Sequence, residues 1–309
     1  MQIIDGNTPW HTDQHTIQTI GFFDGVHLGH KFLLQQVIDE AHKRNLKSMV
    51  VTFRQHPRKV LHPESHIPLL TTINEKLQLI EQSGIDYVAL LDFDLRLSQM
   101  DAHQYMEHVL KNSLHNQALV IGYDHHFGKR DGKGFTEYKQ YGDQMGIDVI
   151  QAKELPPEQC THASSTAIRK LLEAGDIAEA NKILGRSYSI TGSVAHGQAI
   201  GRSIGFPTAN ITPNSADKLI PQNGVYATLT HIGTKTYKSM LYIGSRPTID
   251  NHLEQRIEAN IFDFNEEIYG QQIHIDFVAR TRGEQRFCSL DQLQTQLTID
   301  KQQVESLLK

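Results

Sequence analysis

The residues between Gly197 and Asn210 have types and spacings that suit the binding of a nucleotide phosphate. Glycines recur at every fourth position (Gly197, Gly201 and Gly205), and their lack of side chains lets backbone N–H groups approach an anion. Arg202 lies among them and offers a planar guanidinium that suits phosphate. We therefore predict that this stretch is a phosphate-binding loop.

The same stretch ends in two neutral oxygen ligands, Thr208 and Asn210. On an extended segment, residues two apart point to the same side, so both oxygens can face one hard cation. Beside the glycine loop, they predict a Mg-nucleotide site. The alternative is a glycine-rich hairpin turn stiffened by Pro207, but a turn does not require Arg202, Thr208 and Asn210. The Walker pattern is excluded, because no Gly-Lys-Ser/Thr follows.

A second candidate site is the loop from Gly21 to His30, which joins a predicted strand to a predicted helix. Sheets flanked by helices bind phosphate at such loops, because helix N–H groups and the helix dipole point at the ligand. His27 and His30 are three residues apart across Gly29, so both can stabilise charge on one phosphoryl group. The alternatives are ordinary residues at a helix start, or zinc ligands for which no third ligand is evident.

Three further segments are expected at the same sheet edge. The run 52–57, Thr-Phe-Arg-Gln-His-Pro, ends the second strand with polar and basic groups. The run 164–169, Ser-Ser-Thr-Ala-Ile-Arg, starts a helix with three hydroxyls. A Ser or Thr there is ordinarily a cap, yet Arg169 one turn later favours a triphosphate cradle. The loop 122–128, Gly-Tyr-Asp-His-His-Phe-Gly, follows the fourth predicted strand. We predict that it receives a planar ring or a ribose.

Composition predicts a globular protein of two domains. The chain has 309 residues, of which 39% are hydrophobic and 21% charged, and this excludes disorder. A net charge of -5 gives no general drive towards nucleic acid or an anionic membrane. The two cysteines, Cys160 and Cys288, are far apart and form neither a disulfide framework nor a thiolate zinc site. The chain shows no membrane-span pattern and no signal peptide, so we expect a cytoplasmic protein.

The first part of the chain alternates strands with helices, which predicts a doubly wound parallel sheet with ligands at the carboxyl ends of its strands. A capping box at Thr72–Glu75 opens one of the helices. A further helix is expected over Asp101–Lys111. The predicted strands are Thr16–Ile20, Ser48–Phe53, Tyr87–Leu91, Ala118–Ile121 and Val149–Ala152.

After Gly185 the pattern changes to short strands with few helices, which predicts an antiparallel sandwich or small barrel. We therefore expect domains at 1–184 and 185–309. A last helix begins near Ser289, and its inner face is expected to carry Leu290, Leu293, Leu297, Val304 and Leu307. The predicted strands are Ile190–Ala195, Gly224–Ile232, Thr236–Ile243, Arg256–Phe262 and Gln272–Val278.

Together these motifs make the chain similar to the prokaryotic bifunctional riboflavin kinase/FMN adenylyltransferase (FAD synthetase) family. The resemblance covers nearly the whole chain. The loop 21–30 matches the nucleotidyltransferase signature Gly-x-Phe-Asp-x-x-His-x-Gly-His, and the run 164–169 matches Ser-Ser-Thr-x-Ile-Arg. The stretch 201–210 matches the kinase motif that ends in Pro-Thr-Ala-Asn. Tyr242 departs from the usual small or amide residue, and a shift by one position in 129–134 leaves the role of Arg130 open.

The resemblance implies a Rossmann-like nucleotidyltransferase domain followed by a six-stranded antiparallel flavokinase barrel with a terminal helix. In the barrel, Glu258 is implied as the base that lets riboflavin attack ATP to form FMN, with Mg²⁺ at Thr208 and Asn210. In the first domain, the FMN phosphate is expected to attack a second ATP, giving FAD and pyrophosphate. The implied phosphate-binding residues are Gly21, Phe23, Asp24, Gly29, Ser164, Ser165, Thr166, Arg169, Gly197, Gly201, Arg202 and Gly205, with His27 and His30 as catalytic groups.

Flavin contacts are implied for Arg282 and, in the loop 122–128, for Asp124 and Phe127. Asp24 either orients a histidine or caps its loop. Two alternatives stay open: the first domain adenylylates another phosphorylated substrate, or the protein is a flavin- or nucleotide-sensing module with one dead site. Against the second, no residue that the chemistry needs has been lost from either site. The oligomeric state is not predicted.

Overall fold

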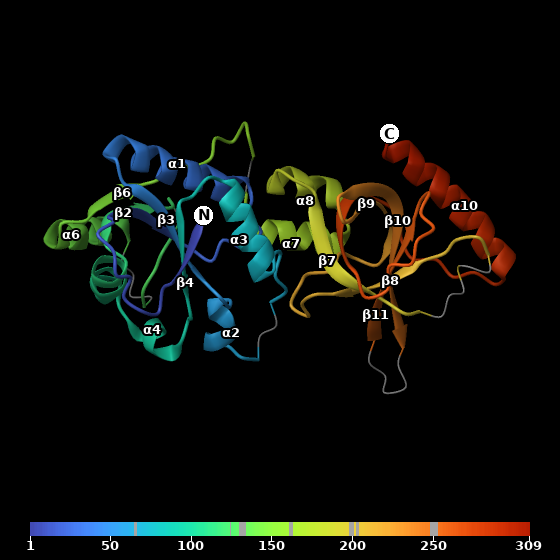
Figure 1. The fold of residues 1–309 in the computed structure, drawn as a ribbon, viewed down its shortest axis with the longest axis horizontal. Helices are drawn as coiled ribbons and strands as arrows, with labels where there is room; N and C mark the ends of the chain where they lie inside the picture. The colour runs from blue at the N-terminus through green and yellow to red at the C-terminus, as the bar shows by residue number, and fades with distance from the viewer. Residues whose placement is uncertain are drawn as a thin grey trace. The chain divides into compact units, whose positions relative to one another are not determined.

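A computed structural model describes residues 1–64, 67–123, 125–129, 134–160, 163–197, 201, 204–247 and 253–309. Contacts between residues divide the chain into two compact units, Met1–Ala163 and Ser164–Lys309 (Figure 1). The predicted Arg202 and Asp124, together with Arg130, lie outside the described residues.

The first unit is built on a six-stranded sheet in the order β1-β4-β3-β2-β5-β6, in which each neighbouring pair is parallel. Its central strands are buried on both faces, as expected for a parallel sheet covered by helices. The strands are β1 (Gln2–Asp5), β2 (Thr16–Ile20), β3 (Lys47–Phe53), β4 (Tyr87–Leu91), β5 (Asn116–Ile121) and β6 (Asp148–Gln151).

Helices cover both faces of this sheet. Met49, Val51 and Phe53 of β3 share a hydrophobic cluster with η1 (Tyr105–Ser113) and α6 (Phe135–Met145). Val50, which points to the opposite face, lies in a cluster with α1 (Leu28–Arg44) and α3 (Ile73–Gln82). The alternation along one strand therefore confirms the predicted doubly wound arrangement. Short helices complete the unit at α2 (Pro57–Leu61), α4 (Leu95–Gln99) and α5 (Ala102–Gln104).

Some elements of this unit differ from the sequence prediction, which included neither α2 nor α4. The edge strand β1 was missed, because only one of its four residues is buried and it carries no apolar run. The helix expected over Asp101–Lys111 forms as α5 and continues as the π-helix η1, where Leu114 N donates to Val109 O five residues back. The capping box at Thr72 and Glu75 is confirmed, with both reciprocal hydrogen bonds present.

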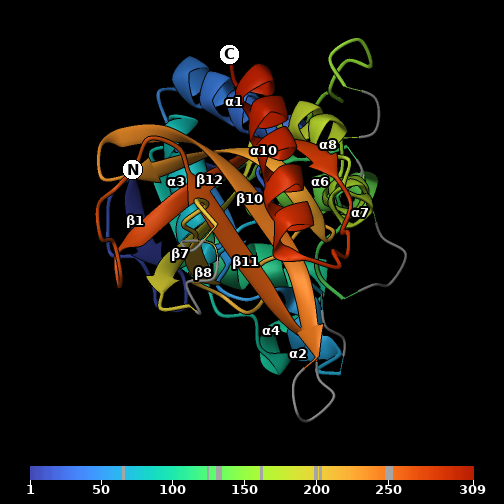
Figure 2. The same ribbon diagram turned by 90° about the vertical axis from the view of Figure 1, so that its right-hand side faces the viewer.

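The second unit contains a closed six-stranded barrel in the order β10-β11-β8-β7-β12-β9, with antiparallel pairs throughout (Figure 2). Closure removes the unpaired strand edges that an open sheet would leave. The predicted barrel is thus confirmed. The strands are β7 (Tyr188–Ala195), β8 (Ala209–Pro213), β9 (Gly224–Ile232), β10 (Lys235–Pro247), β11 (Leu253–Ile261) and β12 (Gln272–Arg282).

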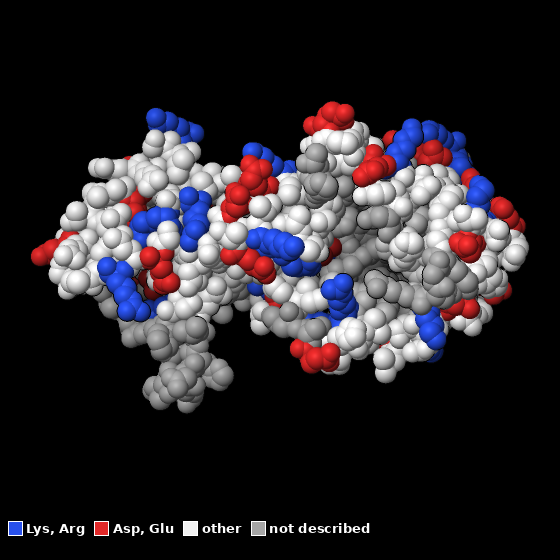
Figure 3. All heavy atoms as spheres, turned by 180° about the vertical axis from the view of Figure 1, so that it is seen from behind, with Lys and Arg blue, Asp and Glu red and all other residues white. Residues whose placement is uncertain are grey.

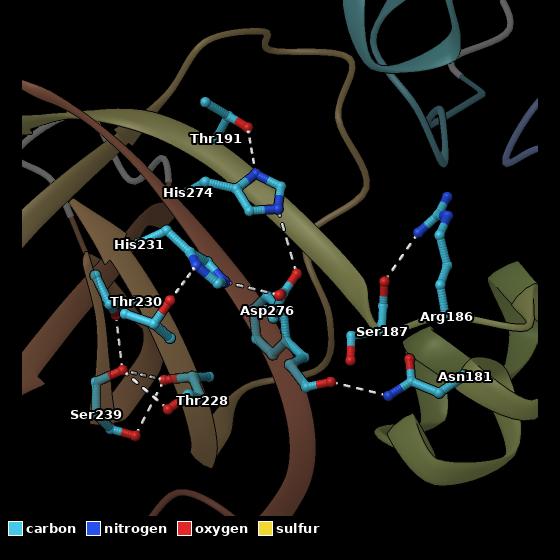
Figure 4. Close-up of polar contacts among 12 residues, drawn as sticks. Asn181, Arg186, Ser187, Thr191, Thr228, Thr230, His231, Ser239, His274 and Asp276 are labelled. Carbon is cyan, nitrogen blue, oxygen red and sulfur yellow. Dashed lines mark hydrogen bonds and ion pairs between the residues drawn. The ribbon is translucent and has the colours of Figure 1, made fainter. Parts of the chain in front are cut away.

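Two helices, α7 (Ser165–Ala174) and α8 (Ile177–Leu184), precede the barrel and belong to the same compact unit. Asn181 connects α8 to the barrel, because its Nδ2 donates to Phe277 O (2.9 Å) and its Oδ1 accepts from Tyr188 N (2.6 Å). Figure 4 shows the side chain of Asn181 reaching the strand that carries Asp276. The compact units therefore divide at an earlier residue than the expected domain boundary at 184/185, which remains a prediction.

Hydrogen bonds between side chains also connect the strands on the outer side of the barrel (Figure 4). Asp276 of β12 accepts from His231 of β9 (2.9 Å) and from His274 on its own strand (3.2 Å). Thr191 of β7 and Thr236 of β10 contact the remaining ring nitrogens of His274 and His231, at 3.0 and 2.9 Å. Burial alone would raise the pKa of Asp276, but the two imidazoles outweigh it and lower that pKa.

The last helix, α10 (Leu290–Leu307), packs beside the barrel, where Val304 and the following Leu308 join a cluster with strands β9 and β10 (Figure 2). Its predicted inner face is wrong at both ends, because Leu290 and Leu307 are 56% and 48% exposed. The side chain of Asp300 faces inward instead and is fully buried.

A buried ion pair fixes α10 to β12. Arg282 donates to Asp300 through Nε (2.9 and 3.1 Å) and through Nη2 (2.7 Å), and Gln296 Nε2 donates to the same carboxylate at 2.9 Å. A forked guanidinium and a carboxylate match each other in this bidentate way. The pair therefore determines where both Arg282 and the helix lie.

The described surface carries charges of both signs. On the face drawn in Figure 3, Lys and Arg groups lie interspersed with Asp and Glu groups. Among the described residues, no helix has the length and apolar character to cross a membrane.

We predict that Asp300→Ala lowers the free energy of unfolding of the barrel unit by about 3–5 kcal/mol, because it leaves the Arg282 guanidinium without its buried partner. Urea denaturation followed by circular dichroism measures the change. Gln303→Ala, at an exposed position of the same helix, is the matched control and should change stability by no more than about 0.5 kcal/mol. Equal midpoints for the two variants would contradict the role of the pair.

Candidate active sites

A cavity of about 320 Å³ lies in the barrel unit, and it brings together five residues that the sequence singled out. Gly201, Thr208, Asn210, Glu258 and Arg282 all line it. The remaining lining residues are Ile204, Phe206, Val225, Met240, Tyr242, Arg256, Asn260, Gln285, Phe287, Leu293 and Leu297.

Four polar residues of the cavity lie on two paired strands, β8 and β11. Glu258 of β11 lies directly opposite Asn210 of β8 in the antiparallel register. Arg256 and Asn260 stand two positions either side of Glu258, and alternation along a strand places all three on one face. Asn260 Nδ2 also donates to Pro207 O (2.7 Å). This bond ties the segment before β8 to β11 and so holds the Pro-Thr-Ala-Asn motif in place.

Two neighbouring side chains hold the carboxylate of Glu258 in place. Its Oε2 accepts from Thr208 Oγ1 at 3.4 Å, and its Oε1 lies 3.4 Å from Arg256 Nη1. A quarter of its side chain is exposed, so it is reachable from the cavity. Tyr242 stands opposite Glu258 in the β10–β11 register. Burial, then the hydrogen bond to Glu284 and the charge of Glu258, raise the pKa of Tyr242, so it remains a neutral phenol.

The structure explains why the loop contains glycines, and the sequence did not reveal this explanation. A side chain on Gly197 would overlap the amide group of Asn210, and one on Gly201 would overlap the carbonyl of Phe206. Phe206 N also donates to Gly201 O at 2.8 Å. These two glycines therefore permit close packing of the loop on itself. Gly205 has open space around it, but its φ of +81° is a backbone conformation that would be strained for a residue with a side chain.

The oxygen donors at this place fit a hard cation. The hydroxyl of Thr208 and the amide of Asn210 are neutral oxygen ligands beside the carboxylate of Glu258, and Mg²⁺ prefers such ligands with phosphate and water completing its shell. In the described part of the chain, no group of three or more His, Cys, Asp and Glu side chains could hold a metal ion. A cation here would therefore depend on neutral oxygens and on a bound phosphate.

The remaining wall of the cavity is mainly apolar. Phe206, Met240, Leu293 and Leu297 supply aliphatic and aromatic surface, which suits a flat ring system. Arg282, implied as a flavin contact, reaches the cavity while Asp300 holds its guanidinium, and the ring of Phe287 lies 5.9 Å from its Cζ.

Sequence reasoning missed Arg256 and Asn260 and treated Tyr242 only as a departure from the family pattern. The two-residue spacing of Arg256, Glu258 and Asn260 was a signal that could have found the first two.

In the first unit, Asp24 fastens the loop 21–30 to a neighbouring segment. Its carboxylate accepts from Leu70 N (3.0 and 3.1 Å), Thr71 N (3.1 Å) and Thr71 Oγ1 (3.2 Å), and Gly25 N donates to Thr71 Oγ1 (3.1 Å). Of the two roles considered for Asp24, the structure supports anchoring of the loop. The sequence carried no signal for Leu70 and Thr71.

The same loop contains backbone conformations that side chains rarely adopt. Phe23 and Val26 have φ values of +55° and +39°, which cost free energy and persist only where surrounding contacts impose them. Gly21 leaves room for the ring of Phe23, and Gly29 leaves room for the ring of His27. These predicted phosphate-binding residues therefore also shape the loop.

His27 and His30 stack at the start of α1, with ring centroids 3.6 Å apart. His27 Nδ1 accepts from His30 N (3.3 Å) and caps the helix, so the proton of the neutral ring resides on Nε2. Burial lowers the pKa of His27 to about 4. Burial and then the charges of His27, His125 and Lys76 hold the pKa of His30 well below its usual value. At neutral pH both rings are uncharged N–H donors.

The other predicted phosphate-binding residues of the first site belong to the second unit. Ser164 caps α7 in the second unit, where its Oγ accepts from Ala167 N at 3.2 Å. Ser165, Thr166 and Arg169 follow in its first turns. Their closeness to His27 and His30 remains a prediction.

Phe127, in the first unit, stacks on Tyr138 with centroids 4.4 Å apart and bonds to its hydroxyl. This gives Phe127 a packing role beside the expected flavin contact.

Comparison with known proteins matches both units. Residues 10–167 match the family model described as FAD synthetase, and residues 184–308 match that of riboflavin kinase. The bifunctional riboflavin kinase/FMN adenylyltransferase of Escherichia coli (strain K12) is 35% identical over 286 residues, which cover 92% of this chain and 90% of that protein. The enzyme of the same description from Haemophilus influenzae is 34% identical over 308 residues, covering 97% of each chain. That from Bacillus subtilis is 35% identical over 291 residues, covering 93% and 91%.

A solved structure shares the fold across the whole chain. The crystal structure described as a macrolide-efflux protein from Streptococcus pneumoniae has a TM-score of 0.88 and 30% identity, and 99% of each chain is covered. The match to FAD synthetase precedes the match to riboflavin kinase along this chain. The three relatives align with nearly all of it. The chain therefore belongs to the bifunctional riboflavin kinase/FMN adenylyltransferase family.

Proposed function

We propose that the two activities of this bifunctional enzyme reside in the two sites described above. Riboflavin is phosphorylated to FMN in the barrel cavity, and FMN is adenylylated to FAD at the loop 21–30. The observation that carries the first assignment is the pairing of Glu258 with Asn210, since it places a carboxylate beside two neutral oxygen ligands in one cavity.

In the barrel, Glu258 accepts the proton of the ribityl hydroxyl as that hydroxyl attacks the γ-phosphorus of ATP, and the bond to the leaving ADP breaks. An alcohol is a poor nucleophile, and a carboxylate within hydrogen-bond reach removes this obstacle. Thr208, whose hydroxyl donates to Glu258 at 3.4 Å, orients the carboxylate. The apolar wall with Met240, Leu293 and Leu297 receives the flavin ring, and Arg282 lies at its edge.

Thr208 and Asn210 would hold Mg²⁺, which neutralises phosphate charge when it is bound. The donor set supports this choice, because hydroxyl and amide oxygens, together with phosphate, suit a small hard cation better than they suit zinc. The loop 197–205 would enclose the phosphates, with Arg202 among its residues.

At the loop 21–30, His27 and His30 stabilise the charge that develops when the FMN phosphate attacks the α-phosphorus of ATP. A phosphate dianion is already a nucleophile, so this step needs no general base. Neutral imidazoles with lowered pKa values suit a role as hydrogen-bond donors and not as proton acceptors. Ser164, Thr166 and Arg169 are proposed to join this site, and a cytoplasmic location is part of the same proposal.

We predict that Glu258→Gln lowers kcat for FMN formation by about 10²–10⁴-fold, because the amide keeps the shape but cannot accept the proton. Conversion of added FMN to FAD should be unchanged. Chromatography of the flavins after incubation with ATP and Mg²⁺ measures both steps. Glu266→Gln, an exposed carboxylate of the same unit, is the matched control. Undiminished FMN formation by Glu258→Gln would remove Glu258 from the mechanism.

We also predict that His27→Asn lowers kcat for FAD formation by about 10²–10³-fold, as expected for the loss of one donor to the transferred group. Asparagine is a good N-cap, so the start of α1 should stay intact, whereas His27→Ala should lose the cap as well. FMN formation on the same chain reports that the protein is folded. His42→Asn, at an exposed position of α1, is the matched control. Normal FAD formation by His27→Asn would refute this site.

A further inference from the structure

Lys76 of α3 is buried, with 2% of its surface exposed. Its ammonium donates to Phe53 O at 2.8 Å, to Phe22 O at 3.1 Å and to Thr52 Oγ1 at 3.1 Å, and it lies 4.1 Å from the centre of the Phe22 ring. None of these three acceptors carries a charge. Lys76 is therefore a buried cation that hydrogen-bonds two backbone carbonyls and a hydroxyl.

Such a group is costly, which argues that it does more than fill space. Burial of an ammonium is unfavourable unless the charge is compensated, and a methionine would pack at this position without that cost. Burial lowers the pKa of Lys76 to about 7, although the charge of Asp24 opposes the change. The hydrogen bonds explain why the chain keeps an amine here, but they do not explain why it needs a charge.

The acceptors of Lys76 come from the two segments that support the histidine loop. Phe22 lies within that loop, directly before the positive-φ residue Phe23. Thr52 and Phe53 are the last residues of β3. Thr52 Oγ1 also donates to Phe22 O at 3.2 Å. Lys76 thus joins the loop to the carboxyl end of the neighbouring strand.

Lys76 also acts electrostatically on the catalytic side of the loop. Its charge is one of the contributions that lower the pKa of His30, so an anion bound by the histidines would interact with the ammonium in return. Among its charged neighbours, Asp24 favours the ammonium and His30 is neutral. On α3 itself, Glu75 is engaged with Thr72 N at 2.9 Å, and Arg54 after β3 pairs with Asp5 and Asp92.

We propose that Lys76 is a positioning residue for adenylyl transfer: its ammonium fixes the loop 21–30 to the end of β3 and supplies positive charge behind the bound phosphates. The inference rests on the proposed assignment of this loop to adenylyl transfer. When ATP binds, its negative charge favours the protonated amine, so ATP binding and protonation of Lys76 support each other.

The direction of the resulting pH dependence follows from the pKa of Lys76 in the free enzyme. Lys76 is protonated below about pH 7 and loses its proton above it, so kcat/KM for ATP in FAD formation should fall as the pH rises through this range. Bound phosphate raises the pKa, so the corresponding fall in kcat should occur at higher pH. A purely structural lysine would produce neither this fall in kcat/KM at alkaline pH nor the shift of the fall in kcat to higher pH.

The experiment compares the full-length protein with Lys76→Met and Lys76→Arg in FAD formation from added FMN between pH 6 and 9.5. We expect Lys76→Met to lower kcat/KM for ATP at pH 6.5 by about 10²-fold, as for a misplaced reacting group, and to lack the alkaline limb. Lys76→Arg keeps a permanent charge, so it should recover part of the activity and remain active above pH 8. FMN formation by the same proteins should be unchanged, and Lys139→Met, an exposed lysine of α6, is the matched control.

The outcomes separate this inference from the site assignment. An unaltered kcat/KM and pH profile in Lys76→Met, with FAD formation lost in His27→Asn, would overturn the role of Lys76 alone. If neither variant affects FAD formation, the assignment of the loop is wrong as well. Should Lys76→Met fail to fold, the native enzyme decides: a kcat/KM that stays level from pH 6.5 to 9 refutes the inference.

Discussion

The barrel site depends on one short stretch of strand pairing, in which Ala209 and Asn210 of β8 face Ala259 and Glu258 of β11. This pairing contributes to closing the barrel and, in the same two residue pairs, places a carboxylate against the Pro-Thr-Ala-Asn motif. Asn260 secures it from the side through Pro207 O. The geometry of the proposed kinase site is therefore inseparable from the closure of the fold, because a shift in register by one residue would turn Glu258 to the other face.

In the first unit, buried contacts hold the loop 21–30 in an unfavourable backbone conformation. Asp24 binds the loop to Leu70 and Thr71, and Lys76 binds it to the end of β3. Both groups are buried, and the two histidines that they position are neutral at pH 7. The loop thus presents uncharged donors on its functional side, supported from within by Asp24 and Lys76. The alternatives of a sensing module and of a different adenylylated substrate are not supported, because both matched domains belong to enzymes of FAD synthesis.

Much of this could be predicted from the sequence, and the failures have physical causes. Periodicity indicated the parallel sheet and the barrel, and the residue types of the glycine loop indicated Gly201, Thr208 and Asn210 of the cavity. Glu258 and Arg282 were implied by the family resemblance. The edge strand β1 escaped because its residues are largely exposed. Leu290 and Leu307 were placed on the inner face of α10, but helical spacing cannot reveal that a buried Asp300 turns that face towards Arg282. Asp24 contacts a residue 46 positions away, and Lys76 contacts residues 23, 24 and 54 positions away. No local sequence pattern indicates pairs so far apart.

The terminal helix is attached to the barrel in a different way from the strands. Leu293 and Leu297 of α10 line the cavity, yet α10 is joined to the barrel by side chains and not by a strand ladder. The ion pair between Arg282 and Asp300 is one of these side-chain contacts. One wall of the cavity is therefore held by side chains, whereas the barrel around it is held by backbone hydrogen bonds between strands. The wall and the barrel can thus be weakened separately.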